Sequence, residues 1–124
     1  MSESTHVRGS QGEQVAARFL IRKGYTILHR NYRDKISRSE IDLVVRQDDC
    51  IVFVEVKTGS AHTFGAPETW VDVRKQRRVA RAASHYIHEH DLYGTDCRFD
   101  VIGITVDQGR YLIKHLEHAF MSTL

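Results

Sequence analysis

The sequence has few of the features that mark membrane, secreted or repetitive proteins. No stretch of its 124 residues approaches the roughly 18 apolar residues of a membrane span, and the N-terminus lacks the apolar segment of a signal peptide. Its two cysteines, Cys50 and Cys97, are too few for a disulfide framework, so reduced thiols are expected. We therefore expect a cytoplasmic protein without a membrane partner.

The length and composition indicate one folded domain. A chain of 124 residues allows a single continuous core and is too short for two comfortable ones. Hydrophobic residues make up 41% and charged residues 27%, as in folded globular proteins. We expect residues 1–9 to form a flexible lead-in and residues 10–124 to form the single domain.

Hydrophobic periodicity predicts two helices and five strands. Helices are expected at 11–23 and 69–90, and strands at 25–31, 39–47, 50–57, 98–106 and 111–116. Tight turns at Asp48-Asp49 and Gln108-Gly109 join two strand pairs, and 58–68 is expected to be a loop. Two helices are too few to cover both faces of a fully parallel sheet. The expected fold is therefore α/β, with a mixed central sheet flanked by helices.

Acidic residues interrupt two of the expected strands at positions that share a face. Because side chains alternate along a strand, Glu40 and Asp42 lie on one face of the first, and Glu55 and Lys57 on one face of the second. Carboxylates inside apolar strands need a partner, and a divalent cation such as Mg²⁺ or Mn²⁺ is one. We predict that Asp42 and Glu55 hold the ion and that Lys57 acts on a water or phosphate beside it.

A simpler interpretation of the same residues is structural. Glu55 and Lys57 could form a salt bridge on a half-exposed strand, with Glu40 and Asp42 solvated, because an E-x-K tripeptide is frequent by chance. The context favours the metal site. The acidic strand comes first, the hairpin is short, and Glu55-Val56-Lys57 closes a hydrophobic strand.

The pattern of Asp42, a hairpin and then Glu55-Val56-Lys57 resembles the PD-(D/E)xK motif of restriction-endonuclease-like nucleases, among them archaeal Holliday-junction resolvases. Ile41 stands where the motif name has proline. More narrowly, the chain resembles the bacterial YraN family over about Gly12 to Phe120. The matching stretches are Gly12-Glu13, Lys23-Gly24-Tyr25, Asn31-Tyr32-Arg33, Glu40-Ile41-Asp42-Leu43, Val52-Phe53-Val54-Glu55-Val56-Lys57-Thr58, Arg98-Phe99-Asp100-Val101 and Ala119-Phe120. The resemblance implies a restriction-endonuclease-like fold and this catalytic motif.

Two further residues acquire a catalytic role through this resemblance. Glu13 is similar to a glutamate that many such nucleases add to the metal site from their first helix. Gln76 matches a Lys or Gln that reaches the active site from a later helix in resolvase-like relatives. Each has a structural alternative, because Ser10 and Glu13 have the spacing of a capping box and Gln76 could make a capping or core hydrogen bond.

Basic residues gather on the second predicted helix. This basic cluster consists of Arg74, Lys75, Arg77, Arg78 and Arg81. With His85, its arginines spread over the outer side of the helix as a continuous strip. The alternative is a solvated face, but few acids lie nearby in the sequence to balance the charge. Because phosphate contacts supply most non-specific nucleic-acid affinity, we predict that this cluster binds nucleic acid, most simply DNA.

Other polar residues are predicted to have structural roles or none. Asp100 lies inside an apolar strand and is expected to pair with an arginine, such as Arg98 or Arg33, rather than with a metal. Histidines at 85, 88 and 90 are the residue type that binds zinc, but their spacing does not place all three on one helical face, which argues against that site.

Three hypotheses about function follow. The first is a Mg²⁺- or Mn²⁺-dependent endonuclease acting on DNA, on branched or damaged structures because nothing resembles a base-reading module. In it Asp42, Glu55 and Lys57 are central, and Glu13, Glu40 and Gln76 assist. The second is an inactive nucleic-acid-binding or scaffolding protein with a nuclease-like fold. The third is an interaction module that forms a homodimer through strand edges and aromatic surfaces such as Trp70.

Overall fold

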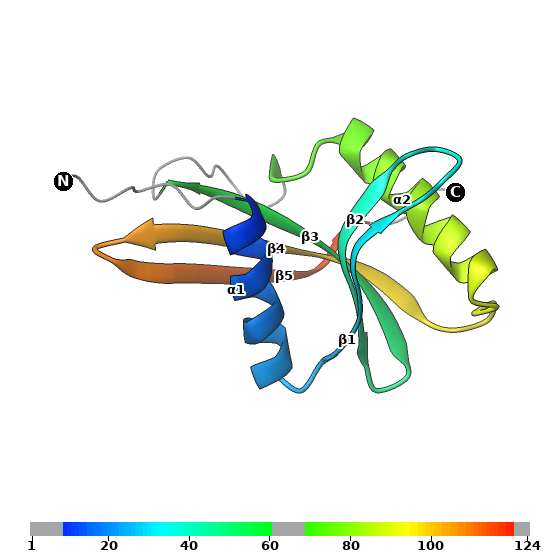
Figure 1. Ribbon diagram of the computed structural model, residues 1–124, viewed down its shortest axis with the longest axis horizontal. Helices are drawn as coiled ribbons and strands as arrows, with labels where there is room; N and C mark the ends of the chain where they lie inside the picture. The colour runs from blue at the N-terminus through cyan, green and yellow to red at the C-terminus, as the bar shows by residue number, and fades with distance from the viewer. Residues whose placement is uncertain (1–8, 61–68, 121–124) are drawn as a thin grey trace.

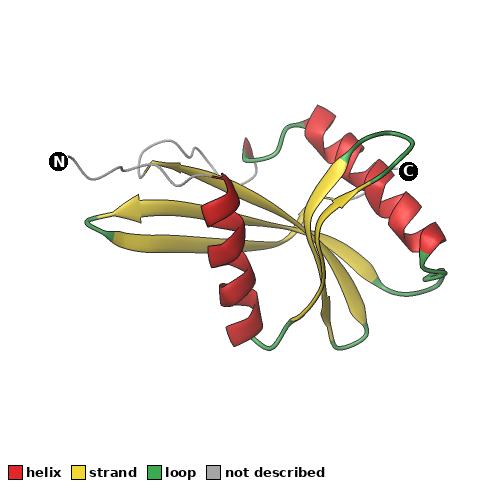
Figure 2. Cartoon of the chain, in the orientation of Figure 1, coloured by secondary structure: helices red, strands yellow, loops and turns green. Residues whose placement is uncertain are grey.

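A computed structural model describes residues 9–60 and 69–120 of the protein. The elements follow one another as α1 (Gly9–Arg22), β1 (Thr26–Arg33), β2 (Glu40–Gln47), β3 (Cys50–Ser60), α2 (Val73–Glu89), β4 (Cys97–Asp107) and β5 (Arg110–Phe120). The five strands form one sheet in the order β1-β2-β3-β4-β5, in which only β3 and β4 are parallel (Figures 1 and 2). The mixed α/β sheet that the sequence predicts is confirmed.

The two helices cover opposite faces of the sheet. Along β2, Leu43 and Val45 pack into the core cluster of α1, whereas Val44 between them packs into the cluster of α2. On β3, Val52 and Phe53 divide in the same way, as the alternation of side chains along a strand requires. Figure 1 shows α1 crossing the sheet and α2 lying beside the end of the β1–β2 hairpin.

Several element boundaries differ from the predicted ones. Helix α1 begins at Gly9, so Ser10 lies inside the helix and does not cap it. Strand β3 continues to Ser60 instead of ending at Lys57, because its parallel pairing with β4 extends that far. The rest of the predicted loop, 61–68, lies outside the described residues, as does all of the predicted lead-in except Gly9.

Helix α2 begins four residues later than predicted, at Val73. Asp72 is its N-cap, and a carboxylate oxygen of Asp72 accepts a hydrogen bond from the Lys75 backbone N–H at 2.8 Å. This cap fixes where the helix starts and therefore which residues of its first turn face the sheet. Neither helix in the described ranges has the length and apolar character that crossing a membrane requires.

Candidate functional site

Two acids meet where β2 and β3 separate. The antiparallel ladder between these strands ends at the pair Leu43 and Val54, so Asp42 and Glu55 are the next residues on each side. The Val56 N–H donates to Asp42 Oδ2 at 2.8 Å, and the Asp42 N–H lies 3.4 Å from Glu55 Oε1. Each carboxylate thus replaces a backbone acceptor at the point where the strands part. The predicted proximity of Asp42 and Glu55 is confirmed.

A surface hollow of about 480 Å³ opens over these acids, and we call it the acidic hollow. It is formed by α1, β2, β3 and the start of α2. Its lining residues are Gly9, Glu13, Asp42, Glu55, Val56, Lys57, Trp70, Val71, Asp72, Lys75 and Arg78. The sheet therefore brings the predicted residues Glu13, Asp42, Glu55 and Lys57 to one place from three elements.

Glu13 faces the two strand acids from α1. Its carboxyl group neighbours that of Asp42, and the Asn31 amide, with its nitrogen turned to the carboxylate, donates to both Glu13 oxygens at 2.9 and 3.3 Å. Asn31 lies beside Asp42 in the β1–β2 pairing. Because Ser10 is inside the helix, the capping-box alternative for Glu13 is wrong. Glu13, Asp42 and Glu55 together are the acid cluster.

All three carboxyl groups of the acid cluster have raised pKa values. Burial, followed by the neighbouring Asp42 charge, raises the pKa of Glu55 to about 8, although Lys75 opposes the shift. Burial also raises the pKa of Asp42, against the Val56 hydrogen bond and the charge of Lys75. Burial and Asp42 raise the pKa of Glu13. Ionising all three carboxyl groups together is therefore unfavourable in the metal-free protein, and a bound cation would offset that cost.

The two lysines of the hollow have different partners from those expected. Lys57 Nζ donates to the Trp70 carbonyl at 3.0 Å, whereas Lys75 Nζ lies 3.3 Å from Glu55 Oε2. The structural alternative of a Glu55–Lys57 salt bridge is therefore wrong. Lys75, predicted only as part of the basic cluster, belongs to the acidic hollow because the Asp72 cap places it in the first turn of α2.

Glu40 and Gln76 lie outside the hollow. Glu40 is exposed and pairs with Arg33, with 3.6 Å between Oε1 and Nε. Gln76 Nε2 donates to the Val71 carbonyl at 2.8 Å, which confirms its structural alternative. Gln76 follows Lys75 in the helix and so points about 100° away from it, and Lys75 takes the place predicted for Gln76.

The four arginines of the basic cluster are exposed on α2. Within the described ranges, no carboxylate forms an ion pair with Arg74, Arg77, Arg78 or Arg81. Arg78 lines both the acidic hollow and a neighbouring hollow of about 240 Å³ beside residues 37–40. The cationic strip thus begins at the acid cluster.

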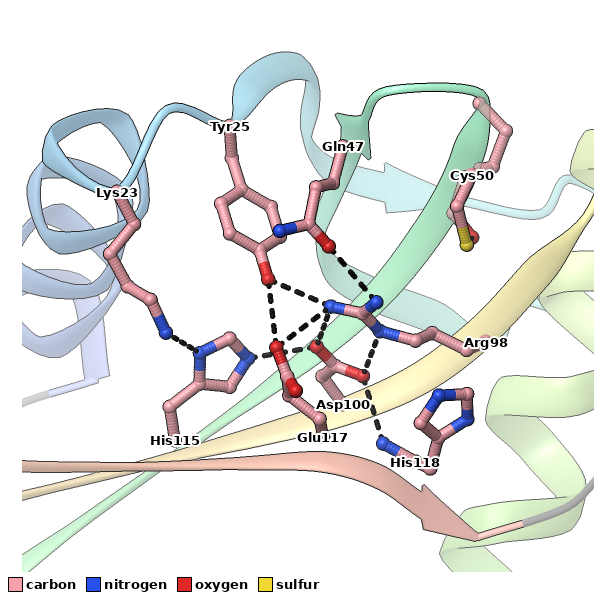
Figure 3. A network of polar contacts seen from close by, with 10 residues as sticks. Lys23, Tyr25, Gln47, Cys50, Arg98, Asp100, His115, Glu117 and His118 are labelled. Atoms are coloured by element: carbon pink, nitrogen blue, oxygen red, sulfur yellow. Dashed lines mark hydrogen bonds and ion pairs between the residues drawn. The ribbon is translucent and has the colours of Figure 1, made fainter.

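A second polar cluster surrounds Asp100, and Figure 3 shows how its side chains converge. The buried Asp100 carboxylate accepts from Arg98 Nε at 3.0 Å and Nη2 at 3.2 Å, so the predicted pairing with Arg98 is confirmed. It also accepts from the His118 N–H at 3.2 Å and lies 2.8 Å from His115 Nε2. Glu117 and Tyr25 both contact the Arg98 guanidinium. These five side chains, Tyr25, Arg98, Asp100, His115 and Glu117, are the Asp100 cluster.

Metal-ligand geometry alone does not identify the functional site. In the described ranges, Asp100, His115 and Glu117 are the group of three whose ligand atoms all lie within 4.8 Å of one another. The Arg98 guanidinium already contacts both acids of that group, so each carboxylate has a cationic partner. Mg²⁺ needs only one or two carboxylates with waters and phosphates, which is what Asp42 and Glu55 offer.

Two expectations about side chains elsewhere have clear outcomes. Trp70 is 5% exposed, so the homodimer hypothesis is wrong in treating it as an exposed aromatic surface. The histidines His85, His88 and His90 contact Asp34, Tyr93 and the Tyr86 carbonyl, respectively. Each ring therefore has a different partner, which agrees with a spacing that does not place all three on one helical face.

Comparison with known proteins identifies relatives along most of the chain. A family model described as uncharacterised protein family UPF0102 matches residues 12–104. A UPF0102 protein of Moorella thermoacetica is 44% identical over 108 residues, covering 87% of this chain and 88% of the relative. Another, from Chlorobium phaeobacteroides, is 39% identical and covers 98% and 99%. A third, from Clostridium perfringens, is 39% identical and covers 90% and 92%.

Proposed function

This chain belongs to the UPF0102 family, and from its acid cluster we propose that it is a divalent-metal-dependent endonuclease that hydrolyses phosphodiester bonds in DNA. The observation that carries the proposal is the convergence of Glu13, Asp42 and Glu55 in an open hollow, all with raised pKa values. Such acids in a hollow, beside exposed arginines that form no ion pair within the described ranges, suit a reaction on an anionic substrate.

The residues present fit a Mg²⁺ or Mn²⁺ ion held by Asp42 and Glu55. Their donors are carboxylate oxygens, which Mg²⁺ prefers. Asp42 uses Oδ2 and Glu55 uses Oε1 for backbone contacts, so Asp42 Oδ1 and Glu55 Oε2 are the candidate ligand atoms. The ammonium of Lys75 beside Glu55 Oε2 supports the view that this position favours a cation. When bound, the ion would neutralise charge on the phosphate and lower the pKa of a water.

The chain's own residues would position the phosphate and move the proton. Lys57 is anchored by the Trp70 carbonyl at the wall of the hollow, where a fixed cation can stabilise charge that develops on a phosphate oxygen. Glu13 is less buried than Glu55, and its raised pKa makes its carboxylate a stronger base. It can therefore accept a proton from the attacking water. Asn31 holds Glu13 in that orientation.

Lys75 has a different task in this proposal. Its side chain is 43% exposed, so it can leave Glu55 for a substrate phosphate without losing a buried position. Arg78, which shares the acidic hollow, and the neighbouring Arg74 and Arg81 would hold phosphates further along the same strand. None of these groups reads a base edge, so we expect selection by shape rather than by sequence.

The test is a cleavage screen with the full chain and Mg²⁺ or Mn²⁺. Substrates are single-stranded, duplex, flap and four-way DNA of shared sequence, with matched RNA versions. We expect metal-dependent cleavage of at least one DNA structure and its loss in Asp42→Asn and Glu55→Gln. The matched control is Glu117→Gln, which changes an exposed acid of the Asp100 cluster. No divalent-dependent cleavage and no stabilisation by the ions would contradict the proposal.

The Lys75–Glu55 ion pair favours one rival, a nucleic-acid-binding protein without turnover. In that case Lys75 is a permanent counter-ion and its loss destabilises the fold. Lys75→Ala separates the two functions. A permanent counter-ion predicts lower stability with and without Mg²⁺, whereas a cation-binding site predicts lower stability without the ion and recovery when Mg²⁺ is added.

A further inference from the structure

A second hollow, of about 460 Å³, lies at the other end of α2. It is formed by β1, residues 34–36 and the last turns of the helix. Its lining includes the rings of His29, Tyr32 and His90, which pack around the buried ring of Tyr86. The His29 ring centroid lies 6.2 Å from that of Tyr32, and the Tyr32 centroid lies 5.0 Å from that of Tyr86, both edge to face. His90 stacks on Tyr86 at 4.1 Å. We call it the ring hollow.

The acids of the ring hollow already have partners. Asp34 accepts from the Ser37 N–H at 2.7 Å and lies 3.1 Å from His85 Nδ1. Glu89 accepts from the Tyr32 hydroxyl at 2.9 Å. Lys35 at the rim is exposed and forms no ion pair within the described ranges. An incoming ligand therefore meets ring surface, the Glu89 carboxylate that accepts from Tyr32, and the exposed Lys35 ammonium at the rim.

Ile36 is the most unusual residue of this rim. It is 81% exposed, more than any other large hydrophobic residue in the described ranges. The Asp34–Ser37 hydrogen bonds hold the turn that carries it. The exposed Ile36 side chain and the aromatic rings can contact a flat, apolar part of a ligand. Lys35 beside them can contact a negative charge on the same ligand.

We propose that the ring hollow is a subsite for a single unstacked nucleobase, with Ile36 and the ring wall contacting the base and Lys35 contacting its phosphate. This subsite rests on the proposed function and extends it, because it names the substrate class as nucleic acid with an unpaired nucleotide near the cleaved bond. Stacking of bases on flat side chains stabilises single-strand binding without sequence preference.

The geometry of α2 connects the two hollows. From Lys75 in the acidic hollow to His88 in the ring hollow, the helix rises about 20 Å. At ~3.4 Å per stacked nucleotide, this corresponds to about six nucleotides, and to fewer if the strand is stretched. Arg78 and residues 37–39 line the smaller hollow between them. The unpaired base is therefore expected within about six nucleotides of the cleaved bond.

The experiment compares Ile36→Ala with Ile21→Ala, a matched control that removes another exposed isoleucine, on the outer side of α1. Binding of the full chain to one labelled oligonucleotide, single-stranded or as a blunt duplex, is measured in EDTA. We expect Ile36→Ala to weaken single-strand binding about 5-fold or more and to leave duplex binding unchanged. Ile21→Ala should change neither.

The outcomes separate this inference from the proposed function. If the wild-type protein binds neither oligonucleotide, the subsite is wrong, whereas the proposed function is decided separately by the cleavage screen with flap and four-way DNA. If the wild type binds but the two variants behave alike, only the subsite is wrong. An equal loss on single strand and duplex also overturns it, because Ile36 would then contact the nucleic acid without receiving a base.

Discussion

The acid cluster and the Asp100 cluster both contain a buried carboxylate, but they differ in how well its charge is compensated. Asp100 is fully buried, yet hydrogen bonds from His115 and Arg98 outweigh its burial and hold its pKa below the usual range. Glu55 is nearly as buried, and its pKa is raised to about 8 because burial and Asp42 outweigh Lys75. Burial alone therefore does not distinguish them.

The difference lies in the supply of donors. The Asp100 carboxylate has contacts with Arg98, His115 and the His118 N–H, which satisfy it without any ligand. The acid cluster brings three carboxylates together with one close ammonium. A polar cluster complete in itself supports the fold, whereas one that lacks positive charge indicates a site for a ligand. Four predictions test this distinction, in decreasing order of expected effect.

The largest expected effect is on stability when Asp100 is changed. Asp100→Asn removes the charge that offsets Arg98, whose side chain is only 11% exposed. Breaking such a buried pair costs roughly 3–5 kcal/mol. The measurement is the free energy of unfolding from urea denaturation. Glu117→Gln is the control, because that carboxylate contacts the same arginine but is 48% exposed, and about 1 kcal/mol or less is expected. Equal effects of the two would remove the contrast between the clusters.

The second expected effect is a pH dependence of opposite sign in the two clusters. The folded pKa of Glu55 lies above its usual value of 4.5, so the stability it contributes is fully present below that value and is lost as the pH rises to about 8. Asp100 has a lowered pKa, so its contribution is present above 3.8 and is lost as the pH falls below it. The metal-free protein should therefore lose up to a few kcal/mol between about pH 5 and pH 8.

Unfolding in urea across this pH range, with EDTA present, measures that loss. Glu55→Gln should flatten the slope above pH 5, while Glu117→Gln should leave it in place. Added Mg²⁺ should restore stability at pH 8. An unchanged slope in Glu55→Gln would show that Glu55 does not titrate in this range and would contradict the raised pKa assigned to it.

The third expected effect concerns Asp42. Asp42→Asn should leave the metal-free protein unchanged or make it more stable, because it relieves repulsion with Glu13 and Glu55 while an amide oxygen can still accept from Val56. Stabilisation by the divalent ion should disappear, a loss of about 2.7 kcal/mol at an ion concentration 100 times Kd. Thermal unfolding with and without Mg²⁺ measures both quantities. A marked loss of metal-free stability would mean that Asp42 has a structural role like that of Asp100.

The residues that the sequence predicted correctly depend on local rules. Strand alternation and the short Asp48-Asp49 turn were sufficient to place Asp42 beside Glu55, because antiparallel pairing follows from the hairpin. Asp100 inside an apolar strand required a partner, and an arginine two residues away lies on the same face.

The contacts that the sequence analysis did not predict depend on how elements pack in the tertiary structure. Whether Lys75 or Gln76 faces the acids is set by the rotation of α2, which the Asp72 cap fixes within one residue. Asn31 reaches Glu13 only because β1 pairs with β2 and α1 packs above them. The Lys57 contact depends on the backbone of Trp70, which lies in an irregular segment before α2. Sequence spacing contains no signal for contacts of this kind.

The fourth prediction concerns alanine substitutions of exposed arginines on α2. These should have the smallest effect on stability and a clear effect on DNA binding. Arg98 is paired with Asp100 and Glu117, whereas Arg74, Arg78 and Arg81 are exposed and have no acidic partner within the described ranges. Replacing these three exposed arginines with alanine should change the free energy of unfolding by less than about 0.5 kcal/mol each. The same change should weaken DNA binding and reduce its salt slope by up to ~0.9 per lost contact.

Lys57→Ala completes this comparison, because it lies in the acidic hollow and not on the strip. It should abolish cleavage in single-turnover assays while binding changes little, since one charge aimed at the reacting phosphate is lost. Binding at several salt concentrations and single-turnover cleavage are measured for Lys57→Ala and for the triple arginine variant. If the triple arginine variant binds with unchanged affinity and salt slope, the strip is only a solvated face. The absence of acidic partners would then not distinguish an arginine that binds DNA from one that is merely exposed.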